Sequence, residues 1–176
     1  TSLNGTGCGY FGASIGTGGT ITSPTPSATR LLTQTRRTVL NSAAGTANTG
    51  GYFRLGSAAT TNSNAVWRGN AAGFGGFFMS LRFGQETLSA TSWTYLGLTS
   101  GVAVAPTSVD PTTSTTLGKI GIGHSGNSGN WKIISNPVGS AIVLNDLGSS
   151  VPVNTTDLIE ATFFAAPNDT DVTWRV

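Results

Sequence analysis

The chain of 176 residues contains few charged side chains, because Asp, Glu, Lys and Arg make up only 9% of it, against about 25% in an average soluble domain. Nine cations and seven anions leave a formal net charge of +2, which is too weak a field to steer a polyanion. Nucleic-acid binding normally needs several phosphate contacts from a basic face, whereas the one local basic cluster is Arg30, Arg36 and Arg37. We therefore expect no nucleic-acid partner.

Cysteine and long apolar runs are also scarce. Cys8 is the single cysteine, which excludes an internal disulfide framework and a multi-cysteine zinc site. No apolar run approaches the roughly 20 residues that a membrane span needs, and we expect neither membrane insertion nor a metal or other cofactor. What is abundant is Gly, at 25 residues, together with Ser, Thr and Asn. A surface hydrated by hydroxyls and amides in place of charges suits an extracellular or particle-borne protein.

The composition changes along the chain near residue 28. Residues 1–28 are rich in Gly, Ser and Thr and close with Pro24 and Pro26, which indicates a connector or a set of short strands and loops. Residues 29–176 are predicted to form one β-sandwich domain. The closing segment 171–176 alternates like an incomplete strand, so we expect a fragment or a processed product of a longer protein, with the domain truncated at its C-terminal end.

Apolar and polar residues alternate in most segments after residue 29. The clearest example is 74–83, which places Phe77, Met79, Leu81 and Phe83 on one face and Phe78, Ser80 and Arg82 on the other. Further strand candidates are 29–40, 51–55, 65–69, 92–98, 118–124, 130–134, 141–145, 158–165 and 171–176. No window of a dozen residues sustains the i, i+3, i+4, i+7 apolar pattern of a helix. The sequence predicts an all-β fold, an antiparallel β-sandwich or jelly roll with almost no helix.

A literal G-x-G-x-x-G occurs at Gly121, Gly123 and Gly126, with Asp146 twenty residues beyond the last glycine. A dinucleotide site needs a strand, the glycines and then a helix whose N-terminal amides face the pyrophosphate. Here the segment after the glycines, 130–134, alternates as a second strand. The motif therefore predicts a hairpin turn, because Gly and Asn accept positive φ at low cost.

Catalytic chemistry has few residues to work with, and we expect no enzyme activity. His124, the only histidine, adjoins Ser125, but neighbours in a strand point to opposite faces and do not form a Ser–His couple. We interpret His124 as a surface turn residue. Glycoside hydrolysis would need two carboxylates at a set separation. The acids are Glu86, Asp110, Asp146, Asp157, Glu160, Asp169 and Asp171. Most of them are expected to form turns, and Glu160 to lie on an outer face.

The segments VWRGNAAGFGGFFMSLRFG (66–84), 95–136 and LIEATFFAAPN (158–168) resemble tail-fibre and tail-tip proteins of tailed bacteriophages, and 19–43 is similar to the lead-in of the same family. The resemblance implies a β-rich homotrimer on the virion, extracellular, that contacts other tail proteins. It also implies a receptor-binding part in host adsorption, with a bacterial surface polysaccharide or lipopolysaccharide as partner. The chain departs from the family at His124, where similar proteins would carry an acid or amide, and ends before the usual continuation.

A low-charge, hydroxyl-rich β surface suits sugars, because Asn, Thr and Ser donate and accept hydrogen bonds and an aromatic ring offers an apolar plate. The candidate plates are Trp67, Trp93, Tyr95 and Trp131. Trp93 and Trp131 are expected to pack between sheets, which leaves Trp67 as the best exposed candidate. The predicted glycan-binding residues are Trp67, Arg68, Asn70, His124, Asn127 and Asn130. Three functional hypotheses follow: glycan attachment, a purely structural fibre or connector protein, and a glycan depolymerase with paired carboxylates.

Overall fold

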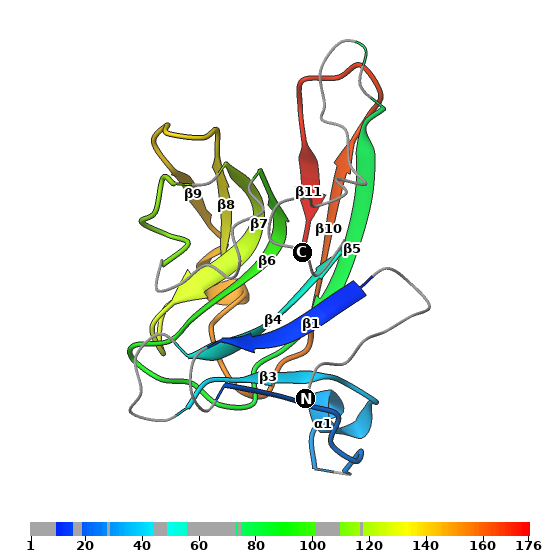
Figure 1. The fold of residues 1–176 in the computed structure, drawn as a ribbon, viewed down its shortest axis with the longest axis vertical. Helices are drawn as coiled ribbons and strands as arrows, with labels where there is room; N and C mark the ends of the chain where they lie inside the picture. Colours follow the sequence, from blue (N-terminus) through cyan, green and yellow to red (C-terminus); the bar gives the residue numbers. More distant parts are fainter. Residues whose placement is uncertain are drawn as a thin grey trace. The chain divides into compact units, whose positions relative to one another are not determined.

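The computed structural model describes residues 10–15, 19–27, 29–43, 49–55, 73, 75–100, 110–116 and 118–176. Figure 1 shows that sheet dominates this part of the chain. The strands are β1 (Tyr10–Ile15), β2 (Thr20–Thr22), β3 (Val39–Asn41), β4 (Gly50–Leu55), β5 (Phe77–Phe83), β6 (Trp93–Thr99), β7 (Lys119–Ser125), β8 (Lys132–Asn136), β9 (Val143–Asp146), β10 (Ile159–Ala165) and β11 (Thr173–Arg175). The helical elements of the described residues are α1 (Leu31–Gln34) and the 3-10 turn η1 (Gly148–Ser150). None of the described helices is long and apolar enough to cross a membrane.

The chain divides into two compact units, one of residues 1–66 and 102–108 and the other of 67–101 and 109–176. In the first unit β1 pairs with β4, and β2 pairs with β3, both antiparallel. Residues 1–28 therefore contribute short strands that pair with later segments of the same unit. The two compact units part near residue 66, and within the first unit this pairing joins strands on either side of residue 28.

The expected strand at 29–40 is wrong over its first half. Residues 31–34 form the single helical turn α1, and extended pairing begins only at Val39. The Thr33 hydroxyl explains the turn, since it accepts a hydrogen bond from the Arg30 amide at 3.1 Å and donates one to the Arg30 carbonyl at 2.9 Å. Leu32 and Thr33 are buried. A local side-chain to backbone bond and the burial of Leu32 thus outweigh the β-propensity of the segment.

The second unit is an antiparallel β-sandwich, as the alternation predicts. One sheet has the order β11-β10-β5, and the other follows chain order as β6-β7-β8-β9. Each of the strands β4 to β11 overlaps, in turn, one of the segments predicted at 51–55, 74–83, 92–98, 118–124, 130–134, 141–145, 158–165 and 171–176. The predicted strand 65–69 lies outside the described residues.

The core of the second unit lies between its two sheets. Its buried cluster consists of Ile122, Trp131, Ile133, Val153, Ile159, Ala161 and Phe163. The apolar face of β5, with Phe77, Met79, Leu81 and Phe83, packs against this cluster, while Phe78, Ser80 and Arg82 are exposed as expected. Burying one side chain of the size of Phe163 stabilises the fold by about 1.5–3 kcal/mol. This rigid two-layer core is what positions the loops and faces that follow.

Candidate functional site

The glycine motif lies in a β-hairpin and not beside a helix. Gly121 and Gly123 belong to β7, Gly126 follows it, and β8 pairs antiparallel with β7 from Lys132 onward. Gly126 and Gly129 have φ of 82° and 89°, which glycine adopts without the steric cost that a side chain would bring. The hairpin prediction is confirmed, and the motif has no helix N-terminus with which to hold a phosphate.

The strand glycines of the motif mark a close approach between β6 and β7. Gly121 faces Gly97 in the register of the two strands. A Cβ at Gly121 would lie 2.8 Å from the Gly97 Cα and would also overlap the Leu96 carbonyl oxygen. At Gly123 a Cβ would lie 2.6 Å from the Thr94 carbonyl oxygen. These glycines are therefore required by backbone packing within the sheet.

His124 is not the surface turn residue that the sequence suggested. It is the last core-facing residue of β7, only 1% exposed, and its ring meets Trp131 edge-on with centroids 4.6 Å apart. Neither ring nitrogen has a hydrogen-bond partner among the described protein groups. Burial lowers the pKa of His124, and Lys132 adds to the effect, whereas Asp110 and the Gly126 backbone, which approaches the ring without forming a hydrogen bond of good geometry, oppose it. The side chain is inaccessible to a sugar, so its assignment to a glycan site is wrong. His124 follows Ile120 and Ile122 at a spacing of two residues, so it lies on the same face of the strand as these apolar residues, and this alternation was the signal for burial.

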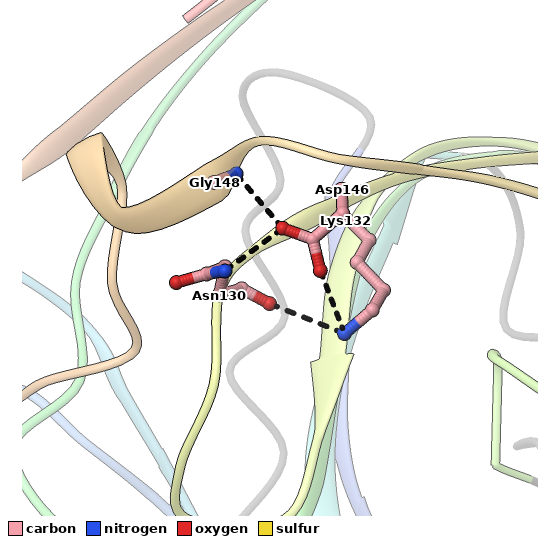
Figure 2. Close-up of polar contacts among 4 residues, drawn as sticks. All are labelled: Asn130, Lys132, Asp146 and Gly148. Atoms are coloured by element: carbon pink, nitrogen blue, oxygen red, sulfur yellow. Dashed lines mark hydrogen bonds and ion pairs between the residues drawn. The ribbon is translucent and has the colours of Figure 1, made fainter.

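The two asparagines of the predicted site differ in their surroundings. Asn127 is exposed at the tip of the β7–β8 hairpin. Asn130 is half-buried, and its Nδ2 donates a hydrogen bond of 2.9 Å to Oδ1 of Asp146. Figure 2 shows the amide oxygen of Asn130 directed away from this carboxylate. Asn127 is thus an exposed residue of the tip, whereas the amide nitrogen of Asn130 serves as an internal brace.

Asp146 organises the polar cluster shown in Figure 2. Its Oδ1 also accepts the Gly148 amide at 2.8 Å, and its Oδ2 lies 3.7 Å from the Lys132 ammonium nitrogen. The Gly148 amide, the Asn130 side chain and Lys132 together hold the pKa of Asp146 below its usual range. The sequence marked Asp146 only as a position relative to the glycines. It did not show that Asp146 holds the start of η1 against the hairpin.

The segment after Asp146 fastens the hairpin tip to the sandwich. The Leu147 amide donates to the Trp131 carbonyl at 3.0 Å, and the Trp131 amide donates to the Val151 carbonyl at 3.1 Å. The Val153 amide donates to the Gly129 carbonyl at 2.9 Å. These bonds hold the backbone that follows the exposed tip, and the Gly126 amide, which donates to the Ser92 carbonyl at 2.8 Å, holds the backbone that precedes it.

The four aromatic plates anticipated from the sequence have three different outcomes. Trp131 is 1% exposed and belongs to the core, as expected. Trp93 and Tyr95 are half-buried on β6, and the Tyr95 hydroxyl donates to the Leu98 carbonyl at 2.8 Å. Burial raises the pKa of Tyr95. Trp67, and with it Arg68 and Asn70, lies outside the described residues.

The loop acids act as turn formers, as expected. Asp110 Oδ1 accepts the Thr112 amide at 2.7 Å, and Asp169 Oδ1 accepts the Thr170 amide at 2.7 Å. Asp157 accepts the Asn154 amide side chain at 2.6 Å. Glu160 is exposed on the outer face of β10. Within the described ranges, no group of three His, Cys, Asp or Glu residues is placed to hold a metal ion.

An exposed aromatic pair, which no sequence pattern predicted, lies on the other sheet. Phe78 of β5 lies directly opposite Phe164 of β10, and both rings are exposed, by 70% and 47%. The alternation placed each residue on the outer face of its own strand. It could not show that the two strands are neighbours in a register that brings the rings together.

No family model, no curated protein and no solved structure matches this chain.

Proposed function

We propose that this chain is a structural virion protein of a phage tail fibre or tail tip and takes part in attachment to a host bacterial surface glycan. The observation that carries the proposal is the β7–β8 hairpin tip, where Asn127 is exposed and Asn130 is braced by Asp146. A polar tip on hydrogen-bonded backbone binds a sugar without a large ordering cost, because little conformational freedom is lost on contact.

The composition and the family resemblance support the same role. With only 9% charged residues, the surface relies on hydroxyls and amides, which match the donors and acceptors of a neutral sugar. We further propose a homotrimer that joins other tail proteins on the virion. Repeating a weak site in this way raises avidity by about 10²–10⁴ without new contacts.

The proposal is tested by binding of the intact chain to an array of bacterial polysaccharides and lipopolysaccharides, with Asn127→Ala as the informative variant. The Asn127 side chain is exposed and braces nothing among the described residues, so its loss is expected to weaken binding without destabilising the fold. Asn130→Ala is less clean, because it also removes the bond to Asp146. Ser140→Ala is the matched control, since Ser140 is exposed in the turn between β8 and β9.

Three results bear on the alternatives. Absence of binding by the wild-type chain to every glycan would favour a purely structural fibre or connector protein. New reducing ends after incubation with capsule or lipopolysaccharide would favour a depolymerase. A strict monomer by light scattering would count against the fibre assignment.

A further inference from the structure

The outer face of the sheet β11-β10-β5 carries three cross-strand rows of side chains. The rows follow from the pairing of β10 with β5 and with β11. The first row is Phe78, Phe164 and Thr173, the second is Ser80, Thr162 and Arg175, and the third is Arg82 and Glu160. We call these eight residues the outer face. Seven are exposed and Thr162 is half-buried. The face therefore has an aromatic row at one end, a charged row at the other and hydroxyls between them.

The aromatic row is unusually open for phenylalanine. Phe78 is 70% exposed and Phe164 47%, whereas the next residue back along β10, Phe163, is fully buried in the core. Side chains directly opposite in an antiparallel pair have Cβ atoms about 4.5–5.5 Å apart, so the two rings form one continuous apolar strip. Ser80 follows Phe78 by two residues and Thr162 precedes Phe164 by two residues, so both lie about 7 Å from the rings on the same side of the strip. The strip is thus bordered by hydroxyl groups.

The charged groups of the outer face are available for a ligand. Arg82, Glu160 and Arg175 are exposed, and among the described residues none of them forms an ion pair or a side-chain hydrogen bond. Two guanidinium groups against one carboxylate leave a local excess of one positive charge. A guanidinium matches a carboxylate through two parallel N–H donors. The charge of the face therefore favours an anionic partner.

The apolar area is too small for a stable protein interface. A whole Phe side chain buries about 150–250 Å², and both rings are already partly covered. A standard interface buries about 800 Å² on each partner and has an apolar core. The outer face offers one apolar row beside two polar ones, which fits the two-sided character of a sugar ring better than a second copy of the chain.

We propose that the outer face is a saccharide-binding platform for a glycan that contains uronic acids. Phe78 and Phe164 stack on the apolar faces of the sugar rings, and Ser80 and Thr162 exchange hydrogen bonds with sugar hydroxyls. Arg175, at the end of the hydroxyl row, pairs with a sugar carboxylate. The inference rests on the proposed attachment function and names a second surface and a substrate class for it.

The test compares binding of the full chain to oligogalacturonate and to neutral maltoheptaose by calorimetry. Phe78→Ser combined with Phe164→Ser is expected to weaken oligogalacturonate binding at least 10-fold. Arg175→Gln is expected to weaken oligogalacturonate binding and to reduce its salt dependence, with no change for maltoheptaose. The matched control is Val143→Ser, which removes an apolar side chain that is 54% exposed on β9, and binding should not change. Circular dichroism checks that each variant is folded.

Several outcomes would overturn the inference and separate it from the proposed function. If wild-type chain binds a surface glycan on the array but the aromatic double variant binds equally well, the platform is wrong and the attachment function stands. If wild-type chain binds no glycan at all, both fail. If wild-type chain self-associates and the double variant is a monomer that still binds sugar, the outer face is a protein interface. If the double variant does not fold, the Arg175→Gln variant alone tests the proposal. An affinity of that variant for oligogalacturonate equal to that of the wild type would refute the platform.

Discussion

Replacing His124 should make the protein more stable and remove its sensitivity to mild acid. His124→Leu keeps a side chain of similar volume in the core but removes two ring nitrogens that have no hydrogen-bond partner among the described protein groups. Relief of an unsatisfied buried polar group is worth about 1–3 kcal/mol. The lost edge-on contact with Trp131 offsets about 0.5–1.5 kcal/mol of this. We expect a net gain in the free energy of unfolding of about 1 kcal/mol at pH 7.5.

The pH dependence follows from the same burial. The pKa of His124 is lower in the folded protein than the value of about 6.5 in an unfolded chain, mainly because burial disfavours the imidazolium. The unfolded state therefore binds more protons as pH falls. Stability is fully present above about pH 6.5 and decreases as pH falls from there toward the folded pKa. A single titrating group limits the slope to about 1.4 kcal/mol per pH unit.

Urea unfolding at pH 7.5, 6.5, 5.5 and 5.0 measures both effects. His124 is the only histidine in the chain, so a slope in this range has few other sources. The carboxylates whose pKa is lowered, Asp110 and Asp146, contribute at lower pH, below about 3.9. His124→Phe, which keeps an aromatic ring beside Trp131, serves as a second variant. A flat wild-type profile from pH 7.5 to 5.0, or a slope in the two variants as steep as in the wild type, would refute the reasoning.

Two further predictions concern the hairpin. Gly121→Ala should lower the free energy of unfolding by about 1–3 kcal/mol, because the new Cβ would lie 2.8 Å from the Gly97 Cα. The control is Gly75→Ala, where a Cβ would have no atom within 4 Å and the change should stay within about 0.5 kcal/mol. Equal effects of the two substitutions in thermal unfolding would contradict the close-packing account. Asp146→Ala should speed hydrogen exchange at the Gly148 amide, because the acceptor of that amide is lost. Asp146→Asn should retain protection, since its amide oxygen can still accept the bond. Equal protection in both variants would show that Asp146 does not brace the tip.

The sequence predicted the elements whose signal is local and missed those that depend on neighbouring segments. Strict alternation was enough to identify β5 and its apolar face, and the absence of a helical pattern after Gly126 was enough to predict the hairpin. The turn at Leu31–Gln34 was missed because a single Thr33 hydroxyl decides it. Pairing of strands far apart in the chain is not encoded in any short pattern, so the meeting of Phe78 with Phe164 could not be foreseen.

The candidate site was predicted less well than the fold, and His124 explains why. Its position beside glycines suggested a turn, while its period-2 relation to Ile120 and Ile122 indicated the core face of β7, and the second signal was correct. The same strand shows why the glycines are there. Gly121 carries no side chain, so Tyr95 can lie over the strand with its hydroxyl 2.9 Å from where a Cβ would stand. That hydroxyl is hydrogen-bonded to Leu98, which removes Tyr95 from the plates that could receive a sugar. A glycine pattern that resembles a phosphate site thus serves to cover one face of β7 with an aromatic ring, and the sugar contacts proposed above lie at the tip and on the outer face.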